Sequence, residues 1–399
     1  METVPPSEIE SRILRFQKAL AEKGLDGAFV LQNVDRYYFS GTIQTSVLFI
    51  PREGEPALMV QKGFERARRE SPLKDVLPVV GRGQIKKRLK ERGWLRLKRI
   101  GLEMDVLPIN LFFRYQQTYP EYEWVDVSEA ILRLRMIKSP YEVEQLRRAA
   151  AILHKGYLEI GGILREGMTE LEVDGHLALI ARREGHMGVM RMRGWNQEMT
   201  HAHVLAGETG AAVSFLDSPH GGMGNTPAMA QGASFRRIGR NEPIGIDYGV
   251  GVNGYIADQF RTFVIGELPD DLRMAHDLSL EIHALFVEKA RPGIPCSELY
   301  RFLLERVKRS AFEGYFNGYG EGKVRFIGHG LGLEIDEYPI LSPRFNQTLE
   351  PGMVIALEPM FVFPDRGIVG LEDDYLITPS GAERLTLTDQ VLLMVETRP

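Results

Sequence analysis

The sequence contains a single cysteine, Cys296, among its 399 residues. One thiol permits no disulfide within the chain, and this composition is typical of proteins from reducing compartments. The sequence also lacks any run of about 18 apolar residues, which is the length that a membrane-spanning helix needs. Its first residues have neither the basic nor the apolar region of a signal peptide. We therefore expect a cytoplasmic protein with no membrane partner.

An excess of positive charge is absent as well. The chain has 49 lysines and arginines against 54 acidic residues, which gives a formal net charge of −5. This balance argues against a nucleic-acid partner of the kind that basic proteins bind. One stretch, residues 82–99, does hold nine basic residues. We interpret it as a solvated helix face, with a phosphate or RNA patch as the alternative.

The chain length predicts two or three domains, and a hydrophobic content of 44% is enough to fill ordinary cores. Residues 1–135 alternate helical and strand patterns, which predicts a small α/β domain. Ser139, Pro140 and Glu142 then form a helix-start signal, so we place the second domain at residues 136–399. Within it, helices followed by strands occur twice. Short strands are expected near residues 189–192, 204–205 and 213–215.

Two acidic residues, Asp247 and Asp258, lie in the two strands of a predicted hairpin in the second domain. Asn253-Gly254 fits a two-residue type I′ turn, which places Gly249 opposite Asp258. Asp247 then lies on the same face as Asp258, diagonally across the strand pair and about 7–8 Å away. Two like charges repel in this arrangement unless a divalent cation lies between them. A polar hairpin on the surface is the alternative.

A second predicted hairpin repeats this arrangement. With a three-residue loop at 364–366, Glu358 lies directly opposite Glu372, and the flanking residues are apolar. Buried acids need partners. A lone histidine, His329, lies between the hairpins in a glycine-rich segment. Two aspartates, two glutamates and one histidine suit one or two divalent ions such as Mn, Co, Fe or Zn.

These five residues resemble, in order and spacing, the metal ligands of the pita-bread metallopeptidases, which include methionine aminopeptidase, aminopeptidase P and prolidase. The matching segments are Asp-Tyr-Gly from 247, Gly-Tyr-Ile-Ala-Asp from 254, Gly-His-Gly-Leu-Gly from 328, Pro-Gly-Met from 351 and Leu-Glu-Pro from 357. The resemblance covers roughly residues 136–399. Residues before it resemble the N-terminal domain of the aminopeptidase P, prolidase and creatinase branch.

The resemblance implies a creatinase-like α/β N-terminal domain and an α+β pita-bread catalytic domain with pseudo-twofold halves. It implies two divalent ions, bridged by Asp258 and Glu372, with Asp247 on one ion and His329 and Glu358 on the other. A hydroxide that bridges the ions would attack the peptide bond, and Glu358 would shuttle the proton. A homodimer, with manganese among the possible metals, belongs to the same expectation.

Three positions depart from the family. Ala230 stands where the peptidases carry a histidine before the first ligand, Asp336 replaces a second histidine, and Gly370 replaces an arginine. We therefore expect weak cleavage of standard Xaa-Pro peptides and a catalytic contribution from Asp336 or a nearby histidine. The candidates are His201, His203 and His220, and we select His220 as a catalytic residue.

The leading function is thus hydrolysis of short peptides by a Xaa-Pro peptidase-like metalloenzyme. One alternative is a metal-retaining non-peptidase that acts on a small amidino, amide or sulfonium compound. Another is a binding protein with a vestigial site. Four clustered acids weigh against the last, because a lost function gives no reason to keep them. The fold alone does not select among these functions.

Overall fold

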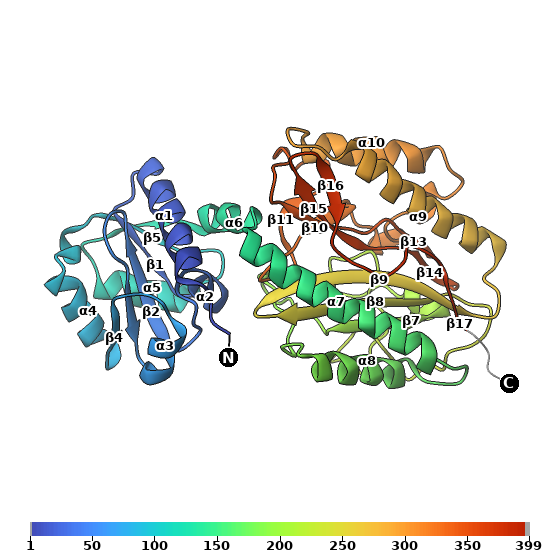
Figure 1. Ribbon diagram of the computed structural model, residues 1–399, viewed down its shortest axis with the longest axis horizontal. Coiled ribbons are helices and arrows are strands. Elements are labelled where there is room, and N and C mark those ends of the chain that lie inside the picture. Colours follow the sequence, from blue (N-terminus) through green and yellow to red (C-terminus); the bar gives the residue numbers. More distant parts are fainter. Residues whose placement is uncertain (1, 396–399) are drawn as a thin grey trace. The chain divides into compact units, whose positions relative to one another are not determined.

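The protein is described by a computed structural model that covers residues 2–395. The chain divides into two compact units, Met1–Arg135 and Met136–Pro399. Figure 1 labels the helices and strands of both. Each unit is considered by itself below.

The first unit is built on one mixed sheet with the strand order β4-β3-β2-β1-β5-β6. β1 pairs antiparallel with β2 and parallel with β5, so the sheet combines a meander with crossover connections. This arrangement confirms the predicted α/β class. The elements are α1 (Pro6–Glu22), β1 (Gly27–Val30), α2 (Asn33–Ser40), β2 (Ser46–Pro51), β3 (Ala57–Val60), α3 (Phe64–Glu70), β4 (Val76–Pro78), α4 (Gly81–Glu91), β5 (Arg99–Leu102), α5 (Ile109–Thr118), β6 (Glu123–Asp126) and α6 (Ser128–Met136).

The basic stretch of this unit lies mainly on α4. Ile85 and Leu89 are buried. Lys87, which lies between them, and Lys90, which follows Leu89, are exposed. This is the pattern of an amphipathic surface helix. It agrees with the interpretation of residues 82–99 as a solvated face.

The second unit begins with a helix whose start the sequence specifies. The Ser139 hydroxyl accepts a hydrogen bond from the backbone amide of Glu142, and the Glu142 carboxylate accepts one from the backbone amide of Ser139, which completes the predicted capping box. α7 (Pro140–Ile163) and α8 (Glu170–Glu184) pack on a sheet of order β17-β9-β8-β7 through a shared buried cluster. The strands are β7 (Ala202–Ala206), β8 (Ile244–Val252), β9 (Tyr255–Ile265) and β17 (Leu393–Val395).

The other half of this unit repeats the plan of two helices on strands. α9 (Asp270–Lys289) and α10 (Cys296–Lys308) cover a sheet of order β11-β10-β12-β15-β16, next to the separate pair β13-β14 (Figure 1). These strands are β10 (Gly328–Gly330), β11 (Glu337–Ile340), β12 (Val354–Leu357), β13 (Met360–Phe363), β14 (Gly367–Gly370), β15 (Asp373–Thr378) and β16 (Gly381–Arg384). The two halves confirm the predicted α+β class.

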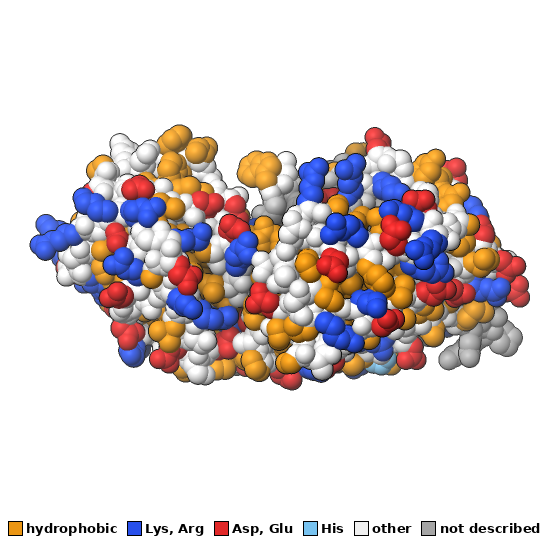
Figure 2. Space-filling model, turned by 90° about the horizontal axis from the view of Figure 1, so that it is seen from above, with side chains coloured by type: hydrophobic (Ala, Val, Ile, Leu, Met, Phe, Trp, Pro, Cys, Tyr) orange, Lys and Arg blue, Asp and Glu red, His pale blue; other side chains and the backbone are white. Residues whose placement is uncertain are grey.

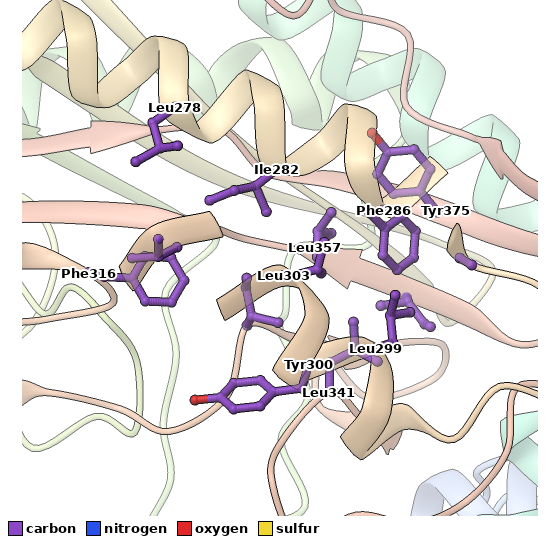
Figure 3. Close-up of a cluster of buried hydrophobic side chains, with 14 of the residues drawn as sticks. Leu278, Ile282, Phe286, Leu299, Tyr300, Leu303, Phe316, Leu341, Leu357 and Tyr375 are labelled. Carbon is purple, nitrogen blue, oxygen red and sulfur yellow. The ribbon is translucent and has the colours of Figure 1, made fainter. Parts of the chain in front are cut away.

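The core of the second half holds the end of β12 in place. Leu357 is fully buried and lies between Ile282 of α9 and Leu303 of α10 (Figure 3). Deleting side chains from such a core typically costs several kcal/mol, so the backbone there is firmly anchored. The residue that follows Leu357 is one of the candidate metal ligands.

Two expected strands do not form. Residues 189–192 and 213–215 are irregular, whereas the strand expected at 204–205 is β7. A short apolar stretch becomes a strand only when a neighbouring strand satisfies its backbone groups. The predictions at 189–192 and 213–215 were therefore wrong, because among the described residues these segments pair with no strand.

None of the helices that the structure describes has the length and apolar character required to cross a lipid bilayer. On the face drawn in Figure 2, lysine and arginine side chains are interspersed with acidic ones. Charges of both signs are therefore mixed over this part of the surface.

A buried histidine in the second half leads to a prediction about acid stability. Gln390 Nε2 donates to the Tyr375 hydroxyl at 2.9 Å, the hydroxyl lies 2.9 Å from His283 Nδ1, and His283 Nε2 lies 3.1 Å from the carbonyl of Leu371. This chain of donors suits a neutral imidazole. Burial lowers the pKa of His283 to about 4.

A histidine with a lowered pKa in the folded state binds its proton more readily when unfolded, so its contribution to stability is lost as the pH falls from about 6.5 to about 4. We expect His283→Gln to reduce the acid-induced loss of unfolding free energy by about 2 to 3 kcal/mol. Urea unfolding of metal-free protein at neutral pH and near pH 4.5 measures this, with His176→Gln as the control. An unchanged pH dependence in His283→Gln would contradict the prediction.

Candidate metal centre

The first acidic pair lies on β8 and β9, as the turn signal predicted. Asn253 and Gly254 have φ values of 49° and 94°, which a type I′ turn requires. The register pairs Gly249 with Asp258 and Asp247 with Phe260. Asp247 and Asp258 are therefore diagonal neighbours on one face. Asp258 is further held by its backbone amide, which donates to Asp374 Oδ2 at 3.0 Å.

The second acidic pair lies where a hairpin passes from one sheet to another. β12 and β15 pair with Leu357 opposite Asp373, and β13 and β14 pair with Met360 opposite Gly370. Both registers place Glu358 opposite Glu372, as predicted, but in the interval between the two sheets. The Glu358 amide donates to the carbonyl of Ile327 at 3.0 Å, which ties it to the segment before β10.

His329 on β10 faces both glutamates. Its Nε2 lies 3.7 Å from Glu358 Oε1 and 3.9 Å from Glu372 Oε1. Its Nδ1 lies 3.0 Å from the carbonyl of Gly330 and 3.4 Å from Asp336 Oδ1. Two acceptors beside Nδ1 favour the tautomer that carries its proton there, so the Nε2 lone pair is directed at the glutamates.

All seven residues predicted for the site line one cavity of about 40 Å³ in the second unit. They are Asp247, Asp258, His329, Glu358, Glu372, Asp336 and His220. A volume of this size holds ions and a few water molecules. The tertiary structure thus brings together residues from four separate segments of the chain.

In the described part of the chain, the four candidate acidic ligands have no lysine or arginine to balance them, and His329 is the cationic group beside them, since the nearby acids raise its pKa to about 9 despite burial. Among the described residues, no lysine or arginine forms an ion pair with any of them. Burial, followed by the charges of Asp258 and Glu358, raises the pKa of Asp247 well above its usual range. Burial also raises the pKa of Glu358 to about 8, although His329 opposes the shift. Metal-free, these groups retain protons that a cation would displace.

The neighbouring Asp373 is also buried, but unlike the cavity acids it is paired with an arginine. It is fully buried, yet Arg261 lies 2.7 Å away, and Gln259 Nε2 and Thr386 Oγ1 donate to it at 2.7 Å. Despite burial, Arg261 and the other partners lower the pKa of Asp373. The fold therefore places an arginine beside Asp373, whereas no described arginine or lysine is paired with the cavity acids.

This donor set fits divalent metal ions. Asp258, His329 and Glu372 each offer a ligand atom within 4.8 Å of the others. The side-chain atom Asp247 Oδ1 is buried and has no hydrogen-bond partner in the described chain. A cation coordinated by these oxygens and the imidazole would cancel the repulsion between the acids and give Asp247 Oδ1 a partner.

The positions that depart from the family have local explanations. A Cβ atom on Gly370 would lie 2.8 Å from the carbonyl oxygen of Pro359, so this backbone has no room for the family's arginine. Asp336 is half exposed at the rim, beside His329. Ala230 contributes its carbonyl as acceptor for the Ser214 hydroxyl.

Of the three histidine candidates, two reach the site. His203 on β7 lies directly opposite Asp247 in the strand register, and His220 lies in the loop that leads to β8. His201 precedes β7 and pairs instead with Asp174 at 3.4 Å. Burial lowers the pKa of His203 to about 4 and that of His220 to about 3.

Sequence reasoning missed two acids near the ligands. Asp217 lines the cavity, three residues before His220, and is one of the charges that raise the pKa of Glu358. Asp374 accepts from the Asp258 amide, and burial followed by Asp258 raises its pKa well above the usual value. The run Glu372-Asp373-Asp374 was the available signal for the second of these.

Comparison with known proteins identifies two family models. Metallopeptidase family M24 matches residues 144–379, and the creatinase/prolidase N-terminal domain matches residues 12–137. A Xaa-Pro dipeptidase of Pyrococcus furiosus is 30% identical over 387 residues, which cover 96% of this chain and 100% of that protein. The predicted family is therefore confirmed.

Solved structures agree with this result. The Xaa-Pro dipeptidase from Bacillus anthracis matches with a TM-score of 0.83 and 25% identity, covering 97% of this chain and 99% of the other. The prolidase from Pyrococcus horikoshii matches with a TM-score of 0.80 and 26% identity, covering 96% and 100%. The expected pita-bread fold is confirmed by these likenesses.

Proposed function

This chain belongs to metallopeptidase family M24, and we propose that it hydrolyses the bond before proline in short peptides. That it is a metal-dependent hydrolase follows from the family and its dipeptidase relatives. The preference for proline in the second position is supported by the names of those relatives. The observation that carries the proposal is one cavity that holds all four candidate acidic ligands and His329, while in the described part of the chain no arginine or lysine is paired with those acids.

We assign the metal ligands to Asp247, Asp258, His329, Glu358 and Glu372, which together hold two divalent ions. Bound there, the ions would supply Lewis-acid activation of the attacking water and of the scissile carbonyl. Asp258 and Glu372, which come from different halves and share the candidate cluster with His329, would hold an ion together with that imidazole.

Glu358 is the proposed proton carrier. Its carboxyl group lines the cavity, and Oε1 lies 3.7 Å from His329 Nε2. A carboxylate whose proton has been displaced by a cation can take up a proton and return it. Glu358 would accept the proton of the attacking water at a carboxylate oxygen and deliver it to the nitrogen of the leaving proline.

The proposal also covers the organisation of the protein. Residues 1–135 would form the creatinase-like domain and residues 136–399 the catalytic domain, supported by the two family matches and the two compact units. A cytoplasmic location is supported by the single, buried Cys296. A homodimer rests on the family resemblance, and sedimentation equilibrium measures it directly.

The most direct test is a substrate panel. Metal-loaded protein is assayed with Xaa-Pro dipeptides, with the same dipeptides carrying alanine for proline, and with small amidino and sulfonium compounds. Turnover confined to Xaa-Pro peptides is expected. Turnover confined to the small compounds would replace the proposed function with the non-peptidase alternative, which the dipeptidase relatives do not favour.

Asp336 is expected to limit the rate on Xaa-Pro peptides. An ionised carboxylate cannot donate a hydrogen bond to a developing oxyanion, whereas an imidazole can, and one such donor is typically worth about 10²–10³ in rate. We therefore expect Asp336→His to raise kcat/KM on a Xaa-Pro panel, with Asp336→Asn as the control that removes only the charge. A wild type already above about 10⁴ M⁻¹s⁻¹, with no gain from the histidine, would show that other residues compensate.

A further inference from the structure

The side of the cavity next to Asp247 carries two histidines that lie outside the proposed set of five ligands. His203 Nδ1 lies 3.9 Å from Asp247 Oδ2, and His220 Nε2 lies 3.5 Å from the same oxygen. The two imidazole rings are 5.7 Å apart and nearly perpendicular. Each of the three residues offers a ligand atom within 4.8 Å of the others. Three donor groups therefore converge on one point.

The hydrogen bonds around His203 determine which of its nitrogens carries the proton. Gln231 Nε2 donates to the carbonyl of Glu198 at 2.7 Å, so its Oε1 is the atom that lies 3.2 Å from His203 Nε2. An amide oxygen can only accept, and therefore His203 Nε2 must be the donor. In a neutral imidazole this leaves a bare lone pair on Nδ1, the nitrogen that faces Asp247. A partner on the far nitrogen is the usual support of a metal-bound histidine.

Two of the facing atoms lack a hydrogen-bond partner among the described residues. His203 Nδ1 and Asp247 Oδ1 are both buried without a hydrogen-bond partner in the described chain. A buried acceptor without a hydrogen bond costs free energy, and no lysine or arginine of the described residues is paired with Asp247. A cation at the point where the three groups converge would satisfy all of them at once.

We propose that His203 Nδ1 and His220 Nε2 ligate a divalent ion together with Asp247. One position of the metal centre is then nitrogen-rich, while the other holds the single imidazole of His329 with Asp258 and Glu372. Imidazole ligands suit Zn, Cu, Fe and Ni, whereas carboxylate and water ligands suit Mg, Ca and Mn. The position at Asp247 therefore favours zinc over manganese. This inference rests on the proposed function only in requiring a metal centre.

The number of imidazoles per ion tests the inference. Protein loaded with Zn²⁺ is analysed by elemental analysis and by X-ray absorption at the zinc edge, which counts histidine ligands. We expect two zinc ions that share three imidazoles. Two ions that share one imidazole would overturn the inference and leave the proposed function intact. Failure to bind any ion would overturn both.

Variants provide a second measurement. The double variant His203→Gln/His220→Gln is expected to bind zinc at least about 100-fold more weakly at one of the two positions. A loss of about 100-fold is the most that removing a hydrogen-bond partner of a metal ligand usually causes, so losing the ligands themselves should cost at least as much. The matched control is His201→Gln, whose side chain pairs with Asp174 outside the cavity. The control should retain both ions. Retention of both ions by the double variant, with affinity within about tenfold of wild type, would overturn the inference. If the double variant does not fold, the imidazole count of the wild type decides.

Discussion

Replacing Glu358 with glutamine is expected to lower kcat by about 10²–10⁴-fold, the usual contribution of a general acid–base group, and to leave the fold intact. Glutamine has nearly the same shape, so Leu357 remains anchored in the core and the amide of residue 358 still donates to Ile327. It cannot accept and release a proton in the neutral range. The loss should therefore appear in kcat more than in KM.

The measurement is steady-state kinetics on metal-loaded protein, with metal content determined on the same sample because Glu358 is also a proposed ligand. Glu321→Gln, an exposed glutamate of the same unit, is the matched control. A folded and fully metal-loaded Glu358→Gln protein that keeps more than about a tenth of wild-type activity would contradict the assigned role.

Removal of the metal is expected to abolish hydrolysis and to lower stability. Purified protein should hold one or two divalent ions per chain, and without the ions the cavity acids are buried with no counter-ion and take up protons. An ion that binds only the folded state stabilises it by about 2.7 kcal/mol at a concentration of 100 times Kd. Chelation followed by thermal unfolding should show the corresponding drop in Tm.

The same experiment contains its own control. Readdition of Mn²⁺, Co²⁺ or Zn²⁺ should restore both Tm and activity, whereas Mg²⁺ and Ca²⁺ test whether charge alone is sufficient. Less than about 0.2 equivalents of bound metal after loading, with no thermal shift, would remove the basis of the proposed site.

The two hairpins explain why so much of the site was accessible from the sequence. The alternation of side chains in a strand and the geometry of a short turn are local properties, so Asn253-Gly254 determines the relation of Asp247 to Asp258. The three-residue loop at 364–366 does the same for Glu358 and Glu372. The capping box at Ser139 located the start of the second unit for the same reason.

Contacts between segments far apart in the chain were not accessible in this way. His203 faces Asp247 because β7 pairs with β8, and a long irregular segment separates these strands. No local pattern reports which strand edge a distant segment will occupy. For this reason His201 and His203 seemed equivalent in the sequence, and two strands were predicted at 189–192 and 213–215 where none forms.

By itself, the sequence determined the class of the two units and the two acidic hairpins, because periodicity, turn chemistry and capping act over a few residues. Only the tertiary structure decided that the candidate ligands share one cavity, that Arg261 neutralises Asp373 and not the cavity acids, and that two histidines face Asp247. These features depend on the burial and the long-range pairing of segments, which set the local electrostatics and are properties of the folded chain as a whole.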